Sequence, residues 1–154
     1  MLYPSLISRL KSQHTSIDIL IAELDNDRLA YRPEPGKWNI LDNIAHLAVY
    51  QPIMINRINS ILVMENPVFD PYKADTDKNF LSARELSADK LLNRLYDDRE
   101  VLCNLLVNLP DQDLSKIGTH LTYGIMTVSQ WAEFFLLHEA HHQFTIFKLA
   151  QSSN

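Results

Sequence analysis

The chain has 154 residues, 46% of them hydrophobic and 21% charged, and its formal net charge is −5. This length and mixture predict one domain over residues 1–154 with a core of its own, and the acidic balance argues against a nucleic-acid partner. No apolar run approaches the roughly 18 residues of a membrane span, residues 1–10 do not resemble a signal peptide, and the single Cys103 excludes an intramolecular disulfide. We therefore expect a cytoplasmic protein without a membrane partner.

Four long segments carry apolar residues every three or four positions, which is the period of a helix that buries one face. These segments are residues 4–29, 39–64, 87–109 and 127–150. Pro52 lies inside the second segment and should kink it or mark a short break. All three glycines fall between the segments.

The connections over residues 30–38, 66–79 and 110–126 are expected to be loops. Short alternations such as residues 120–125 are too brief to pair into a sheet, so the sequence predicts an all-α four-helix bundle. The connection at 66–79 is long enough to cross the whole bundle, which allows parallel neighbours. The sequence alone leaves the topology open.

The last helix carries two histidines on its inward face. Thr127 and Gln130 form a capping-box pattern at its start, and the inward face then includes His138 and His142. These two are one turn apart, so their imidazoles can bind one ion. The alternative is a pair of core histidines bonded to neighbouring side chains.

The same stretch, His138 to His142, also spells H-E-x-x-H, the signature of zincin metalloproteases. Zincins take their third ligand from downstream, and residues 143–154 contain no His, Glu or Asp. This absence counts heavily against a zincin arrangement. A third ligand must come from upstream, and His46, two turns into the second helix, is the candidate. Three imidazoles would leave coordination positions open, as in catalytic sites.

Three runs of sequence together resemble the DinB-like family of metal-binding four-helix bundles. They are K-W-N-I-L-D-N-I-A-H-L at 37–47, G-I-M-T-V-S-Q-W at 124–131 and H-E-A-H-H at 138–142. The resemblance implies an up-down-down-up bundle and a divalent metal, often zinc or nickel, on residues matching His46, His138 and His142. It also implies relatives that use low-molecular-weight thiols as transferases or isomerases. Many relatives carry an acidic residue soon after the histidine of the second helix, where this chain has Tyr50 and Gln51.

Other polar residues near these motifs have alternative roles. Glu139 is a candidate catalytic residue as a general base, or a partner of a ligand imidazole, or an exposed residue. His141 lies about 100° around the helix from His142 and should leave the metal face. His14 has no partner signal and is expected to face solvent.

Candidate substrate-binding residues are Trp38, at the start of the second helix, and His120 and Tyr123, before the last helix. His120 and Tyr123 either line the mouth of the site or lie on the surface. Cys103 stands among leucines, which indicates an inert core thiol.

Two classes of function follow from these features. In the first, a metal-dependent enzyme activates a thiol for S-transfer, or water for hydrolysis, on a small-molecule substrate. In the second, a non-catalytic protein binds a metal or a partner in a stress response. A homodimer is compatible with either class.

Overall fold

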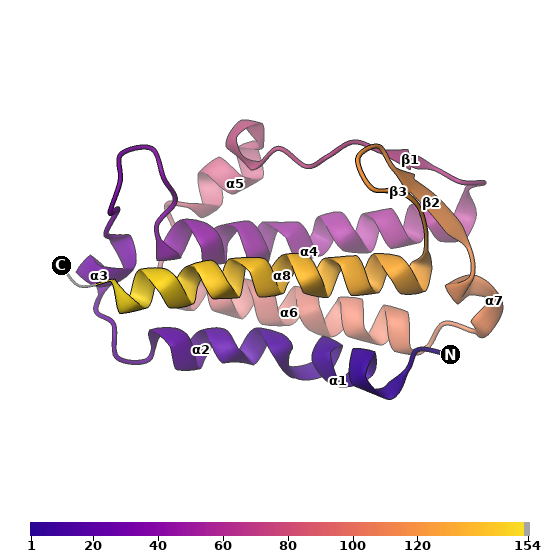
Figure 1. The fold of residues 1–154 in the computed structure, drawn as a ribbon, viewed down its shortest axis with the longest axis horizontal. Helices are drawn as coiled ribbons and strands as arrows, with labels where there is room; N and C mark the ends of the chain where they lie inside the picture. The colour runs from indigo at the N-terminus through magenta and orange to yellow at the C-terminus, as the bar shows by residue number, and fades with distance from the viewer. Residues whose placement is uncertain (153–154) are drawn as a thin grey trace.

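Four helical arms lie side by side along the long axis of the molecule in the computed structural model, which describes residues 1–152 (Figure 1). The arms are α1 (Pro4–Ser12) continued by α2 (Ser16–Ile21), then α4 (Ile40–Val63), α6 (Ala88–Val107) and α8 (Val128–Gln151). In Figure 1, α1 and α2 run right to left, α4 and α6 both run left to right, and α8 returns to the left. The predicted four-helix bundle with up-down-down-up order is therefore confirmed.

Two of the long helices begin as their cap residues predict. Asn39 caps α4 in a reciprocal capping box with Asp42, and Thr127 caps α8 in another with Gln130. Each box satisfies two backbone N–H donors that would otherwise lack partners at the first turn. Of the two predicted effects of Pro52, the short break is wrong, because α4 continues through it as a single helix, and the kink stays a prediction.

The prediction of one helix over residues 4–29 is also wrong. The segment divides into α1, a 3₁₀ turn η1 (Gln13–Thr15), α2 and a short α3 (Asn26–Ala30). The Thr15 hydroxyl donates to the Ser12 carbonyl and the Ser16 hydroxyl donates to the Gln13 carbonyl. Such local bonds compete with regular helix, and here they span three residues, the spacing of a 3₁₀ turn.

A small three-stranded sheet forms where the sequence predicts only loops. Strand β1 (Val68–Phe69) pairs in parallel with β2 (Ile117–His120), which pairs antiparallel with β3 (Gly124–Thr127). The same connections contain η2 (Ala74–Thr76), α5 (Lys78–Ala83) and α7 (Asp111–Leu114). The strands are too short to show a pattern in sequence, and long-range pairing defines them.

Gly118 explains how the sheet reaches the bundle. A Cβ on Gly118 would lie 2.7 Å from the Cγ1 atom of Ile61 on α4, so only glycine allows this approach. Gly124 follows the β2–β3 turn with φ at +82°, a conformation that L side chains rarely adopt. Together they place the end of β2, at His120, beside the ring of Trp131 in the first turn of α8.

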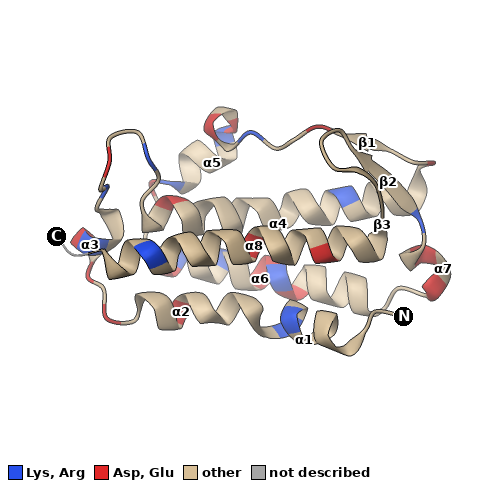
Figure 2. Cartoon of the chain, in the orientation of Figure 1, with Lys and Arg blue, Asp and Glu red and all other residues tan. Residues whose placement is uncertain are grey.

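The apolar core is divided into two clusters along the bundle. One cluster includes Leu10, Met54 and Leu102, and the other includes Ile17 and Leu95. Buried polar side chains lie near the boundary between the clusters, among them His14, Gln51, Arg99 and Glu139. Charges of both signs are otherwise scattered over helices and connections (Figure 2). In the described residues, no helix is long and apolar enough to cross a membrane.

Candidate metal centre

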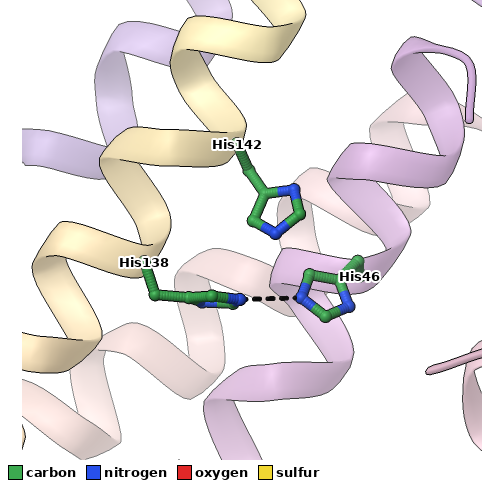
Figure 3. Close-up of side chains that lie close together, drawn as sticks. All are labelled: His46, His138 and His142. Carbon is green, nitrogen blue, oxygen red and sulfur yellow. Dashed lines mark hydrogen bonds between the residues drawn. The ribbon is translucent and has the colours of Figure 1, made fainter. Parts of the chain in front are cut away.

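Three histidines meet between α4 and α8. His46 comes from α4, and His138 and His142 come from successive turns of α8 (Figure 3). One ring nitrogen from each lies within 4.8 Å of the other two, so the group could hold a metal ion. The sequence prediction named these residues, and the structure brings them together.

The ring nitrogens show that the group suits a cation. His46 Nε2 and His138 Nε2 lie 3.0 Å apart, so one must carry a proton to avoid facing lone pairs. The Nδ1 atoms of both rings are buried without a hydrogen-bond partner in the described residues. A divalent ion would remove the lone-pair conflict, and zinc–nitrogen bonds of 2.0–2.1 Å imply nitrogens about 3.3 Å apart.

Burial keeps all three imidazoles neutral, the form that binds metal. Burial and the nearby rings of His142 and His138 lower the pKa of His46 to about 2. Burial and His141 lower the pKa of His138 to about 4, with a further contribution from Arg57. Burial and His138 lower the pKa of His142 to about 3.

Asn43 orients the third imidazole. Its side-chain amide donates to the Asn39 carbonyl at 2.7 Å, which directs its Oδ1 atom toward His142 Nδ1 at 2.9 Å. His142 therefore carries its proton on Nδ1 and presents the lone pair of Nε2 to the other histidines. Such an outer hydrogen bond fixes the tautomer of a metal ligand.

Asp42 attaches the neighbouring connections to this end of α4. It accepts hydrogen bonds from Arg32, in the connection before α4, and from Arg84 at 2.7 Å, at the end of α5. Burial alone would raise the pKa of Asp42, but the two arginines and the Asn39 amide hold it below its usual value. The connections beside the histidines are thus fixed by a buried, charged carboxylate.

Aromatic rings surround the three histidines. The ring centroid of Trp38 lies 5.1 Å from that of His46, and the ring centroid of Tyr50 lies 4.4 Å from that of His138. A cavity of about 480 Å³ borders all three histidines, and Trp38, Tyr72 and the 73–76 segment form its other walls. This volume accommodates a small molecule beside the imidazoles.

The predicted substrate-binding residues lie at these walls. Trp38 lines the 480 Å³ cavity, while His120 and Tyr123 line a smaller cavity of about 160 Å³ that also borders His46 and His138. The structure therefore places all three beside the histidines. Substrate binding by them stays a prediction.

Glu139 lies elsewhere. It is fully buried, with one oxygen accepting from Gln13 at 3.0 Å and the other paired with Arg99 of α6. Burial raises the pKa of Glu139, and the Arg99 charge opposes that rise. Because both oxygens are engaged away from the histidines, the prediction that Glu139 acts as a base at the metal is wrong. The zincin interpretation fails with it.

His14 also differs from its prediction. It is 7% exposed, and its Nδ1 atom lies 3.1 Å from Arg99 Nη1, so it does not face solvent. Cys103 is buried, as expected for a core thiol. His141 is exposed and lies outside the three-histidine group, in the direction predicted.

Sequence reasoning missed several residues that support the site. Three of them share one side of α4 with His46. Asn43 lies three residues before His46, and Tyr50 and Arg57 lie four and eleven residues after it. These offsets place all four on one helical face. These residues could have been found in the sequence as a polar stripe along an otherwise apolar helix.

Comparison with known proteins agrees with this geometry. Residues 9–146 match the DinB superfamily. The chain belongs to this family. No curated protein sequence matches it.

Two solved structures from Bacillus subtilis share the fold. YfiT, described as a probable metal-dependent hydrolase with an unusual four-helix bundle topology, has a TM-score of 0.82 at 20% identity, covering 96% of this chain and 85% of YfiT. The DinB-like protein YjoA has a TM-score of 0.64 at 16% identity, covering 96% of this chain and 90% of YjoA. At these identities the likeness concerns the fold.

Proposed function

We propose that this DinB superfamily protein is a divalent-metal-dependent enzyme that acts on a small molecule. The observation that carries the proposal is the convergence of three neutral imidazoles beside an open cavity of about 480 Å³. His46, His138 and His142 would hold the ion, with zinc or nickel as the candidates. A divalent ion bound by three imidazoles lowers the pKa of a thiol or water that it binds, which supplies a nucleophile at neutral pH.

The residues around the site favour S-transfer from a low-molecular-weight thiol. Hydrolysis needs a base close to the attacking water, and Glu139 is held by Arg99 and Gln13 instead. A thiol can lose its proton to solvent and needs no such base. Trp38 and Tyr72 then provide aromatic walls for the substrate, while Asn43 keeps His142 in the ligating tautomer.

Metal-dependent hydrolysis is the second candidate. The printed description of YfiT favours it, and Asp75, at the wall of the 480 Å³ cavity, is the carboxylate that could serve as its base. Asp75 already accepts a hydrogen bond from Trp38 Nε1 at 3.3 Å, which orients it toward the cavity wall.

The test is a paired assay on metal-loaded and chelator-treated protein. Thiol consumption is followed with a chlorodinitrobenzene electrophile and several low-molecular-weight thiols, and ester cleavage is followed with nitrophenyl esters. We expect metal-dependent thiol consumption that is lost in His138→Ala and kept in Asp75→Asn. Metal-dependent ester cleavage lost in Asp75→Asn would instead establish hydrolysis. Turnover that is equal with and without metal would contradict both.

A further inference from the structure

Arg57 is a buried cation without a carboxylate. It is 7% exposed, and it forms no ion pair with any Asp or Glu of residues 1–152. Its guanidinium donates to the Tyr50 hydroxyl at 3.1 Å and to the Asp70 carbonyl at 2.7 Å, both neutral acceptors. Buried charges are usually paired, whereas the charge of Arg57 meets only neutral acceptors and the aromatic rings of Tyr50, Phe69 and Trp131, whose centroids lie 5.6–5.9 Å away.

The bond to Arg57 determines what the Tyr50 hydroxyl can do. Because the oxygen accepts from Arg57, the O–H hydrogen points elsewhere, and among residues 1–152 the hydroxyl takes part only in this one hydrogen bond. Tyr50 is 3% exposed and lines the cavity of about 160 Å³ beside His46 and His138. Its hydroxyl is therefore a donor available to a ligand in that cavity.

His120 supplies a second donor at the same cavity. Its Nδ1 atom accepts from the Thr122 backbone N–H at 3.1 Å, so the neutral ring carries its proton on Nε2. That Nε2–H has no acceptor in the described part of the chain, and His120 lines the cavity with Tyr50. The last residue of β2, in a segment that the sequence predicts as a loop, thus brings this ring to the cavity.

We infer that the 160 Å³ cavity is an anion subsite, in which the Tyr50 hydroxyl and the His120 Nε2–H donate to one small oxyanion such as a carboxylate. The charge of Arg57, directly behind Tyr50, supplies the compensation that such an ion needs. The cavity has room for a group of a few heavy atoms, since a water occupies about 30 Å³ in the liquid.

The subsite adds a substrate class to the proposed function. It depends on that proposal only for the presence of a metal ion at the neighbouring histidines. Because His46 and His138 border both this cavity and the larger one, a substrate would place its reactive centre at the histidines. A carboxylate or carbonyl oxygen on that substrate would lie between Tyr50 and His120. The substrate class is therefore small molecules with such an oxygen next to the reacting atom.

Cobalt-loaded protein tests the inference without a turnover assay. Azide is titrated by visible absorption, and acetate is then used to displace it. We expect Tyr50→Phe and His120→Leu each to weaken azide and acetate by about tenfold or more, with unchanged cobalt stoichiometry. Tyr72→Phe is the matched control, because Tyr72 lines the same cavity but donates its hydroxyl to Asp77 at 2.8 Å. Its anion affinity should change by less than about twofold.

Two results would overturn the subsite. One is anion affinity in folded Tyr50→Phe equal to that of the unmodified protein, and the other is equal loss in Tyr50→Phe and Tyr72→Phe. If the protein binds no cobalt, the proposed metal function is wrong, and the subsite is then tested on metal-free protein by nitrogen NMR of the His120 ring during acetate titration. A shift abolished by Tyr50→Phe supports the subsite, and the absence of a shift refutes it.

Discussion

Two polar clusters lie on different sides of α8 at the same height of the bundle. The Arg99 cluster joins Arg99, Glu139 and His14, and the histidine cluster joins His46 and His138 with His142. Arg99 donates to Glu139, to Gln51 at 3.1 Å and to the Leu10 carbonyl at 3.3 Å, so its charge is fully compensated. The histidine cluster instead leaves two buried Nδ1 atoms without partners and brings two Nε2 atoms face to face.

The difference separates a cluster whose polar groups are paired from one whose polar groups are left open. A buried network that satisfies its members links helices and gives them a fixed register, whereas unsatisfied buried groups are costly and need a ligand. Only Gln51 Nε2 lacks a partner at the Arg99 cluster in the described residues. The same helix face that appears as H-E-x-x-H in sequence thus divides between the two clusters, with Glu139 in one and the histidines in the other.

The largest expected effect is the loss of metal affinity when the histidine cluster is disrupted. His46→Ala removes one of three ligands, and metal affinity should fall by orders of magnitude, as it should in His138→Ala and His142→Ala. His14→Ala removes an equally buried histidine from the Arg99 cluster and should keep its metal. Metal content by elemental analysis, with folding checked by circular dichroism, is the measurement. Full occupancy in folded His46→Ala would show that the three-histidine assignment is wrong.

The next largest effect is a loss of stability when the Arg99 cluster is disrupted. Glu139→Gln leaves the Arg99 charge buried without compensation, which should lower the free energy of unfolding by about 3–5 kcal/mol in urea titrations. Metal content should not change. The double change Arg99→Met with Glu139→Leu should recover most of the loss, because no charge is left buried. Loss of metal in folded Glu139→Gln would place Glu139 at the metal after all.

A smaller effect, graded with pH, concerns the metal-free protein. The pKa is about 4 for His14 and His138, about 3 for His142 and about 2 for His46, all below the 6.5 of the unfolded chain. Between pH 6.5 and about 4 the unfolded state binds more protons, so stability is present above pH 6.5 and falls as the pH drops through this window. Each histidine contributes at most about 1.4 kcal/mol per pH unit.

Thermal melts of metal-free protein at pH 7.5, 6 and 5 measure this loss. The lowered pKa of Asp42 affects stability only below about pH 4, so Asp42 does not contribute to the change measured between pH 7.5 and 5. Metal should reduce the loss, because it binds the folded neutral histidines. A melting temperature that is constant or rises from pH 7.5 to 5 would contradict the burial of these rings in solution.

The sequence by itself determined the features that depend on neighbours within one helical turn. The period of the apolar residues gave four helices, and the caps at Asn39 and Thr127 are local hydrogen bonds between residues three apart. The pairing of His138 with His142 is likewise a matter of spacing along one helix. His46 was only a candidate from the second helix, supported by the resemblance to a family, since nothing local connects it to α8.

Only the tertiary structure decided which groups face each other across helices. Glu139 lies one residue from His138, yet a rotation of about 100° assigns it to Arg99, and no local pattern shows what lies opposite. The burial of His14 and the placement of His120 by the small sheet depend in the same way on segments far apart in the chain. Helical period fixes the direction of a side chain on its own helix, but its partner is fixed by how the helices and strands pack.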